Sequence, residues 1–175
     1  MDSGNFYFIS DDYFNKYDGL GLLKNKESIN NESHKRPCYY AFKDVGSDIY
    51  WMIPISSKID KYQKEYRKTI NKYGICDGIS FGYLLGDKKA FLVQNMFPVI
   101  EKYIVDIYID KNKLVPVSIP SKLQSELNAK IRKALRLYRK GTKIVLTMAL
   151  EIEKYLIIEI ESEKVIAEVA ITKDI

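Results

Sequence analysis

The positions of apolar residues predict short strands in the first third of the chain. Phe6–Ile9 is an aromatic run typical of a strand. Cys38–Phe42 and Ile49–Ile53 are further apolar runs, joined by a short link that contains Gly46, and this arrangement indicates a β-hairpin. Pro54 has no N–H to give to a neighbouring strand, so the second strand should end there or lie at a sheet edge.

The middle of the chain predicts a second hairpin and one more strand. Apolar runs at 79–85 and 90–93 flank Gly86-Asp-Lys-Lys89, a typical turn sequence. Regularity breaks at 95–99, which contains a proline, and a strand-like apolar run resumes at 103–109. Most of the predicted strands therefore lie in the first two-thirds of the sequence.

Between residues 59 and 73 the apolar pattern takes the period of a helix. Side chains at spacings of 3, 4, 4 and 3 share one helical face, namely Ile59, Tyr62, Tyr66, Ile70 and Tyr73. Lysines form a second stripe on this segment, at Lys61, Lys64, Lys68 and Lys72. Gly74 follows, and a glycine directly after a periodic segment is a common helix stop.

The best-defined helix is expected from Ser121 to Lys140, directly after a proline. Ser121 and Gln124 fit a capping box, in which each side chain binds the other residue's backbone N–H. The side chains expected on its buried face are Leu123, Leu127, Ile131, Leu135 and Tyr138. A shorter helix is predicted from Thr147 to Leu156, and the pattern beyond it fits a helix or a strand equally.

These elements indicate an α+β fold with a small antiparallel sheet, because most strands precede the last helices. A helical turn at 11–17 and a polar loop at 19–35 complete the N-terminal part. The 175 residues have the size of one domain, 1–175. With 46% hydrophobic and 29% charged residues, the chain is neither disordered nor embedded in a membrane.

Charge is distributed unevenly along the chain. The formal net charge is +5, yet residues 111–143 hold ten basic residues and one acid, Glu126, whereas the segment from Glu151 onwards holds seven acids and three lysines. Such a basic segment is either a solvated helix face or a surface for nucleic-acid phosphates, which release counterions when Lys and Arg bind them. The cations of the predicted helix that fit this second role are Lys130, Lys133, Arg136, Arg139 and Lys140.

The inventory of reactive side chains excludes several classes of enzyme. His34 is the single histidine, so the chain can form neither a His pair for acid–base catalysis nor a two-His metal site. Nucleotide-binding glycine motifs, HExxH and EF-hand spacings are missing. Cys38 and Cys76 lack metal-binding spacing, which favours a reduced, cytoplasmic protein. Met1–Asn5 does not resemble a signal peptide, and no run approaches the roughly 20 apolar residues of a membrane span.

The segment Pro54–Lys58 carries the most suggestive chemistry. Its sequence, Pro-Ile-Ser-Ser-Lys, brings two hydroxyls and an ammonium group to the start of a basic helix. Ser56 and Ser57 at such a junction fit a helix N-cap. The same groups fit a phosphate site, which needs hydroxyl donors, a helix N-terminus and a nearby cation. The sequence alone leaves both interpretations open.

The order of several motifs resembles the toxins of type III toxin–antitoxin systems. The motifs are Phe6-Tyr-Phe-Ile-Ser10 with Tyr13, Arg36-Pro37, Tyr50-Trp-Met-Ile-Pro-Ile-Ser-Ser-Lys58 and Asn95-Met-Phe-Pro-Val99. Their order and spacing are similar to the ToxN/AbiQ family, and most of all to its CptN branch, over about residues 6–145. The acidic tail beyond about residue 155 lies outside this resemblance.

The resemblance implies a fold and an activity. The family has a strongly twisted antiparallel sheet that forms a partial SH3-like barrel, as in the Kid/MazF toxins, with helices around it. Its members act in abortive infection and phage resistance as endoribonucleases that need no metal or cofactor. They cut single-stranded RNA, including mRNA, and leave a 2′,3′-cyclic phosphate. A small repeat RNA folded as a pseudoknot inhibits the toxin in a closed RNA–protein assembly, and the toxin cuts the precursor of that RNA.

The resemblance also implies site residues. The catalytic set carried over by motif is Ser57, Ser56, Lys58, Arg36 and Tyr13. Ser57 matches the family's key hydroxyl, and either Lys58 or Lys61 fills its lysine position. Beside the basic helix, the residues expected to bind RNA are Lys61, Lys64, Lys68 and Asn95.

Two alternatives belong to other functional classes. A noncatalytic RNA-binding module would need only the basic helix and the tyrosines, which suit base stacking. A DNA-binding regulator ranks lower, because no clear pair of recognition helices is present. We expect neither DNA nor a membrane as a partner.

Overall fold

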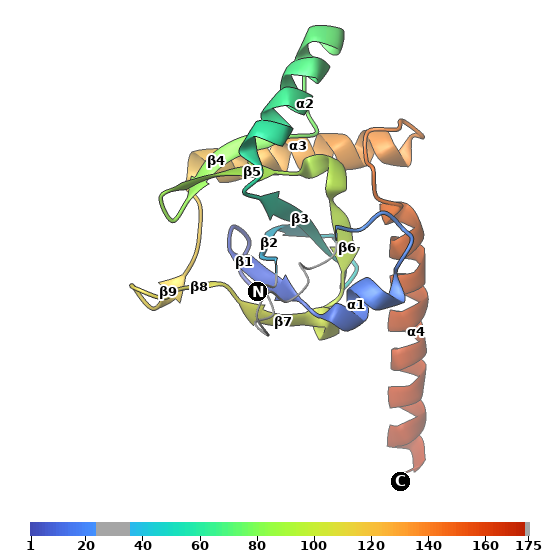
Figure 1. The fold of residues 1–175 in the computed structure, drawn as a ribbon. Helices are drawn as coiled ribbons and strands as arrows, with labels where there is room; N and C mark the ends of the chain where they lie inside the picture. Colours follow the sequence, from blue (N-terminus) through green and yellow to red (C-terminus); the bar gives the residue numbers. More distant parts are fainter. Residues whose placement is uncertain (24–35, 174–175) are drawn as a thin grey trace.

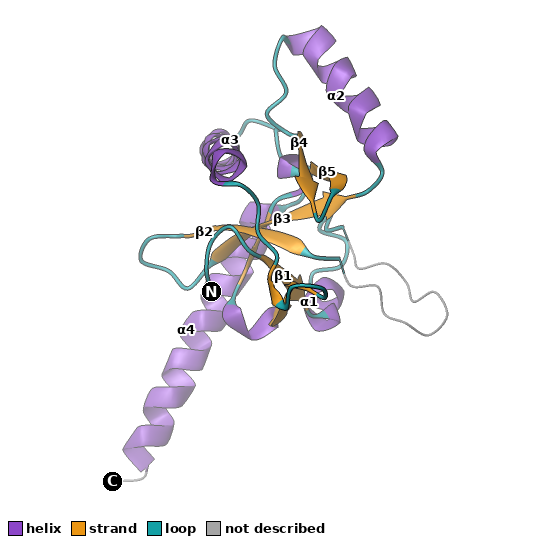
Figure 2. Ribbon diagram, turned by 90° about the vertical axis from the view of Figure 1, so that its left-hand side faces the viewer, coloured by secondary structure: helices purple, strands orange, loops and turns teal. Residues whose placement is uncertain are grey.

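The structure, a computed structural model, describes residues 1–23 and 36–173 and shows an antiparallel sheet flanked by helices (Figures 1 and 2). The strands are β1 (Phe6–Ile9), β2 (Cys38–Lys43), β3 (Tyr50–Ser56), β4 (Ser80–Leu84), β5 (Asp87–Phe91), β6 (Phe97–Val99), β7 (Ile104–Ile107), β8 (Ile109–Asp110) and β9 (Val115–Pro116). The helices are α1 (Asp11–Lys16), α2 (Ile59–Tyr73), α3 (Ser121–Arg139) and α4 (Ala149–Lys173), with the 3-10 turns η1 (Val93–Asn95) and η2 (Glu101–Tyr103). His34 and most of the predicted loop at 19–35 lie outside the described residues.

The sheet is open. Its described strands follow the order β4-β5-β3-β2-β1-β7, with β6 also paired to β3, and every pairing is antiparallel. Strands β8 and β9 form a separate two-stranded sheet. Since β4 and β7 remain at opposite ends of the order, the sheet does not close on itself. The prediction of an α+β fold with a partial barrel is confirmed.

The predicted first hairpin, β2–β3, forms, but its second strand does not end at Pro54. β3 continues to Ser56 in the middle of the sheet. On one side, Pro54 lies opposite Cys38 of β2. On the other, its carbonyl accepts a hydrogen bond of 3.1 Å from the Leu92 N–H, and the proline nitrogen faces the same side. The missing N–H therefore falls where β3 changes partner from β6 to β5, which makes the predicted stop or edge at Pro54 wrong.

The second hairpin, β4–β5, is confirmed with a tighter turn than predicted, because Leu84 already pairs with Asp87. The stretch predicted to be irregular contains a strand. β6 pairs with the start of β3, and Pro98 lies opposite Trp51. A strand of three residues is too short to show a period of two, so the sequence pattern gave no sign of it.

Helix α3 has the predicted start and buried face but no capping box. Its N-cap position is Pro120, without a side-chain cap. The Gln124 amide Nε2 instead donates to the Ile119 carbonyl at 3.2 Å, so the Ser121–Gln124 prediction is wrong. Proline sets a backbone conformation from which a helix can start directly, which makes the serine cap dispensable.

Helix α4 is much longer than the predicted segment from Thr147 to Leu156, because it runs on for 25 residues. Ile152 and Leu156 are buried against the body. Ile158 and Val165 are exposed, and Figures 1 and 2 show the last turns of α4 extending away from the sheet.

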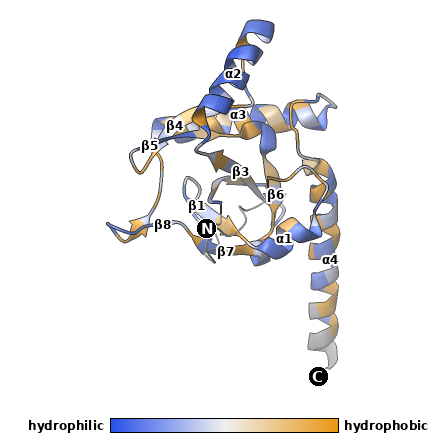
Figure 3. Cartoon of the chain, viewed as in Figure 1, coloured by the Kyte–Doolittle hydropathy of each residue, from blue (hydrophilic) through white to orange (hydrophobic). Residues whose placement is uncertain are grey.

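The core lies on both faces of the sheet. On one face, Leu127 of α3 packs into a cluster with Trp51 of β3. On the other, α1 and the first half of α4 contribute Tyr13 and Ile152 to a second cluster. A third cluster joins α2 to the β4–β5 hairpin through Tyr62, and most of the remaining surface of α2 is hydrophilic (Figure 3). This packing holds the start of α2 next to the ends of β3 and β5.

Candidate active site

A cleft of about 470 Å³ lies where β3 ends and the chain turns into α2. The basic and hydroxyl side chains in its wall are Arg36, Ser56, Ser57, Lys58, Lys61 and Lys89. Its apolar wall includes Ile55, Tyr62, Leu84, Leu85 and Tyr108. The cleft therefore brings together four of the five residues predicted to be catalytic, all except Tyr13.

A compact turn presents the two serines. The Ser56 Oγ accepts a hydrogen bond of 3.2 Å from the Lys58 N–H, and the Ser57 carbonyl accepts one of 2.9 Å from the Ile59 N–H. The N-cap position of α2 is Lys58, and no side chain caps the helix. The N-cap interpretation of the serine pair is therefore wrong, and the exposed Ser57 side chain is left to face the cleft.

Lys89, which the sequence analysis did not select, contacts the predicted key hydroxyl. Its Nζ donates to the Ser57 Oγ at 3.0 Å and forms an ion pair of 3.1 Å with the Asp87 carboxylate. The Lys89 side chain is only 17% exposed, so its ammonium group is held within the wall of the cleft. No pattern in the sequence marks this residue, because 32 positions separate it from Ser57.

Arg36 reaches the cleft from the segment that precedes β2. Its Nη1 donates to the Ile55 carbonyl at 3.3 Å, which fixes the half-buried guanidinium group beside the end of β3. An arginine at this place can offer several N–H groups to one phosphate. The wall of the cleft is therefore basic on at least two sides.

Tyr13 lies in the core rather than in the cleft. It is fully buried, and its hydroxyl donates to the Pro98 carbonyl. Rings of Phe14, Tyr17, Phe97 and Tyr103 surround it. Burial raises the pKa of Tyr13 well above its usual value, so the phenol stays protonated. We therefore leave Tyr13 out of the site, and a catalytic role for it remains a prediction from the resemblance alone.

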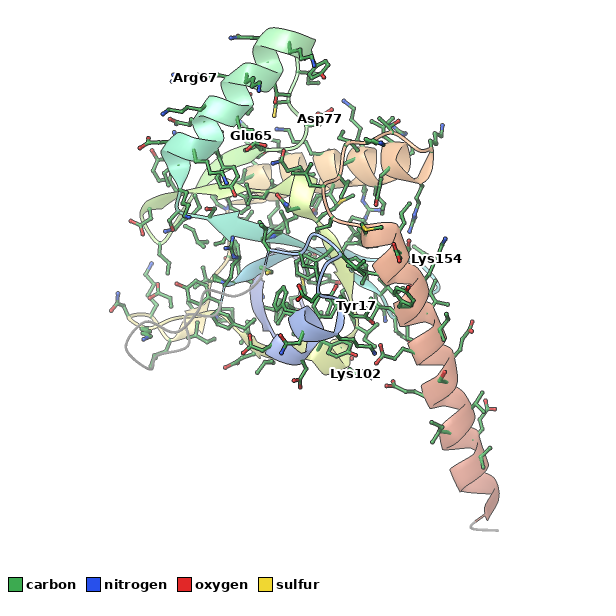
Figure 4. The ribbon with its side chains drawn as sticks, turned by 45° about the vertical axis from the view of Figure 1, so that its right-hand side comes forward. Tyr17, Glu65, Arg67, Asp77, Lys102 and Lys154 are labelled. Carbon is green, nitrogen blue, oxygen red and sulfur yellow. The ribbon has the colours of Figure 1, made fainter. Side chains whose placement is uncertain are left out.

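The other residues predicted to bind RNA lie in four places, the cleft, the rest of α2, η1 and the α3 region. Lys61 lines the cleft. Lys64 and Lys68 are exposed further along α2, and Asn95 is buried in η1. Figure 4 shows Glu65 and Arg67 on α2 and Asp77 between α2 and α3. Of the remaining five residues, four lie on α3 and Lys140 is its C-cap.

A second hollow, of about 530 Å³, runs along α3 beside β2. It includes Lys133, Arg136, Arg139 and Lys140 of the predicted set, together with Arg132. Several of the α3 cations already have acidic partners. The ion pairs are Lys130–Glu126, Lys133–Asp77, Arg139–Asp44 and Arg139–Glu153. Within the described residues, Arg136 and Lys140 form no ion pair, so among the predicted cations they are the best placed to bind an external phosphate.

Three further observations bear on the chemistry of the chain. Within residues 1–23 and 36–173, no group of three or more His, Cys, Asp or Glu side chains could hold a metal ion. Cys38 and Cys76 are buried free thiols, and burial raises the pKa of Cys38 to about 12. None of the helices in the described part of the chain has the length and apolarity to cross a membrane.

The fold and the cleft together define a class of protein. Its members have an open twisted antiparallel sheet and a basic cleft that carries serines at the end of a central strand. Among solved structures, the chain is similar to AbiQ, a lactococcal anti-phage endoribonuclease belonging to the type III toxin–antitoxin system. The TM-score is 0.55 at 14% identity, over 77% of this chain and 82% of AbiQ. No protein-family model and no curated protein sequence matches the chain.

At this level of identity the similarity shows a shared fold. It agrees with the resemblance to the ToxN/AbiQ family that the motif order indicated. It does not distinguish the CptN branch from the others, so that finer placement stays a prediction.

Proposed function

We propose that this protein is an endoribonuclease toxin of a type III toxin–antitoxin system that acts on single-stranded RNA in the cytoplasm. The observation that carries the proposal is the cleft, where Arg36, Ser56, Ser57 and Lys58 meet although the first of them lies 20 residues from the others. These residues come from the motifs that resemble the family, and the fold is shared with an endoribonuclease of that system. Motif order and geometry thus support the same site.

The reaction we propose is transesterification by the RNA itself. The ribose 2′-oxygen attacks the adjacent phosphorus, the bond to the 5′-oxygen breaks, and a 2′,3′-cyclic phosphate remains. The 2′-hydroxyl loses a proton and the leaving 5′-oxygen gains one. The protein must hold the nucleotide in line and stabilise the negative charge that develops on the phosphate. A nucleophilic side chain and a histidine are therefore unnecessary.

The residues of the cleft suit these tasks. Arg36 and Lys58 can neutralise the charge on the non-bridging phosphate oxygens. The Ser57 hydroxyl can donate to one of those oxygens, while Ser56 stabilises the turn that presents it. The apolar wall, with Tyr62 and Tyr108, can take up an unstacked base of single-stranded RNA.

We further propose that the hollow along α3 binds the phosphates of the antitoxin RNA, a small repeat RNA folded as a pseudoknot. Arg136 and Lys140 provide cations there, and Arg132 lies 4.3 Å from the Phe42 ring centroid, a geometry that also suits stacking on a base. Such an RNA would cover the cleft in a closed RNA–protein assembly and would be released from its precursor by the toxin. Tandem short repeats followed by a terminator, directly upstream of the gene, would support this pairing.

The cleavage activity is tested with the purified protein and an mRNA transcript in the presence of EDTA. We expect cleavage that EDTA does not inhibit, and product ends that carry 2′,3′-cyclic phosphates. Ser57→Ala should slow cleavage by about 100-fold or more, as loss of a donor to a developing anion does. Ser125→Ala, at an exposed position of α3, is the matched control and should cleave like the wild type.

Three results would contradict the proposal. Loss of activity in EDTA would refute the metal-independent mechanism. Full activity of Ser57→Ala would refute the site. RNA binding without any cleavage would instead establish the noncatalytic RNA-binding module as the function.

A further inference from the structure

The cleft contains a lysine that the motif around Ser57 does not contain. Lys58 and Lys61 both line the cleft, but the ammonium group within hydrogen-bond distance of the Ser57 hydroxyl belongs to Lys89 of β5, at 3.0 Å. The backbone N–H of Lys58 is turned instead to the Ser56 Oγ. A residue distant in the sequence therefore occupies the place next to the key hydroxyl.

We propose that Lys89 is the positioning residue for Ser57 in RNA cleavage, an inference that rests on the proposed function. An ammonium group has only donors, so in the contact between Lys89 and Ser57 the serine oxygen must accept. The serine proton is then left to point elsewhere, and the exposed side chain of Ser57 faces the cleft. Lys89 thus presents the Ser57 O–H as a donor to a phosphate oxygen and polarises that O–H bond.

The strand register explains why these two residues meet. β3 and β5 are antiparallel, with Ile55 opposite Phe91 and Ser56 opposite Ala90. One step further in the same register, Ser57 comes opposite Lys89. Residues directly opposite each other in antiparallel strands have side chains on the same face, with Cβ atoms about 5 Å apart. The contact is therefore set by the sheet and not by a chance rotamer of a surface lysine.

The second partner of Lys89, Asp87, does not draw it away from Ser57. Its partner Asp87 is 75% exposed, so that ion pair is screened by solvent and holds the lysine only loosely. An ammonium group has three donors, of which Ser57 and Asp87 take two. Lys89 can therefore keep its contact with Asp87 while it donates to Ser57.

The test is a double-mutant cycle on single-turnover RNA cleavage. The variants are Lys89→Met, Ser57→Ala and the two combined, each checked for wild-type circular dichroism and melting temperature. We expect Lys89→Met to slow cleavage by about 100-fold, and the double variant to be no more than about 3-fold slower than Ser57→Ala, because the lysine acts through the serine. Lys88→Met is the matched control, since Lys88 is exposed and lies over the Phe81 ring on the other face of the strand.

A rescue experiment separates positioning from a purely structural role. Lys89→Cys, treated with 2-bromoethylamine, regains an amine of nearly the length of lysine. Both native cysteines are buried, so the introduced thiol is the accessible one. We expect alkylation to restore at least about a tenth of the wild-type rate, whereas alkylation of the wild-type protein should leave its rate unchanged.

The outcomes distinguish the inference from the proposed function. Wild-type protein that cuts RNA while Lys89→Met cuts equally fast would overturn the role of Lys89 alone. Additive losses in the double variant, or a failed rescue in a folded Lys89→Cys protein, would also overturn it. A wild-type protein that does not cut RNA at all would overturn the proposed function itself.

Discussion

The carboxylate of Glu159 joins α4 to the body through several polar contacts, and their contribution to stability can be tested. Glu159 forms an ion pair of 2.8 Å with Lys16 and a second ion pair with Lys102. It also accepts hydrogen bonds from the hydroxyls of Tyr103, at 2.7 Å, and Tyr17, at 3.2 Å. Figure 4 shows Tyr17 and Lys102 on the side of the body against which α4 lies. These contacts link α1 and η2 to the helix just before it leaves the sheet.

The magnitude follows from the pKa of Glu159. Burial alone would raise this pKa, but the hydrogen bonds from Lys102, Lys16 and Tyr103 outweigh it and lower the pKa from 4.5 to about 2. A difference of that size corresponds to about 3 kcal/mol of folding free energy. Lys16 and Lys102 are 46% and 41% exposed, so solvent screening reduces the contribution to about 1–2 kcal/mol.

The sign of the pH dependence is fixed by the direction of the shift. A carboxylate whose pKa is lowered in the folded state stabilises the protein at any pH above the carboxylate's ordinary pKa. This contribution is lost as the pH falls from about 5 towards 2. Glu159→Gln should therefore lower the free energy of unfolding by about 1–2 kcal/mol at pH 7. The difference from the wild type should shrink by more than half at pH 3, where the wild-type carboxylate becomes protonated on unfolding.

The assay is urea unfolding, followed by the fluorescence of the buried, single Trp51 and by circular dichroism for α4. Glu163→Gln is the matched control, because this carboxylate lies one turn further on, is 52% exposed and contacts Lys102 alone among these partners, at 2.6 Å. It should cost no more than about 0.5 kcal/mol. A Glu159→Gln effect that is equal at pH 7 and pH 3, or no larger than that of the control, would refute the reasoning.

Two further predictions concern RNA binding and the core. Arg136→Gln combined with Lys140→Gln should weaken RNA binding and reduce the slope of log K against log salt by about 1–2, measured by fluorescence anisotropy; an unchanged slope would exclude α3 from the RNA interface. Thr147→Val should lower the free energy of unfolding in urea by about 1–3 kcal/mol, because the buried Thr147 Oγ1 donates to the Met96 carbonyl at 2.5 Å. The control Thr69→Val, on the surface of α2, should lower it by less than about 0.5 kcal/mol. Equal costs for the two threonines would contradict the account of the core.

The predictions that succeeded depend on local signals. The helical spacing of Tyr62 and Tyr66 and the stop at Gly74 define α2 without reference to the rest of the chain. The two hairpins are likewise local, because each joins strands that are neighbours in sequence. The buried face of α3 was also predicted from a local signal, because Leu127, Ile131 and Leu135 repeat at one-turn spacing. All three are buried.

The predictions that failed concern interactions set by distant partners. Pro54 predicts a strand end because it has no N–H to donate. In the structure no N–H is needed there, because β3 changes its neighbour from β6 to β5 at this position. The length of α4 was missed because its far half has apolar and charged residues around the whole helix, which blurs the period of one buried face. The catalytic role of Tyr13, which rests on motif order, stays a prediction, because the packing of α1 places this residue in the core and not in the cleft.

The site also combines residues that local sequence signals predict with a residue that they do not predict. The Ser56-Ser57-Lys58 motif could be recognised because its residues are adjacent and lie between a strand and a helix. Lys89 could not, because its meeting with Ser57 depends on the register between β3 and β5, and no pattern in the sequence specifies that register. A one-residue slip would turn Lys89 to the opposite face and bring Lys88 or Ala90 to the hydroxyl. The chemistry of the cleft is therefore a property of strand pairing, and changes that move β5 relative to β3 should affect cleavage without touching any residue of the motif.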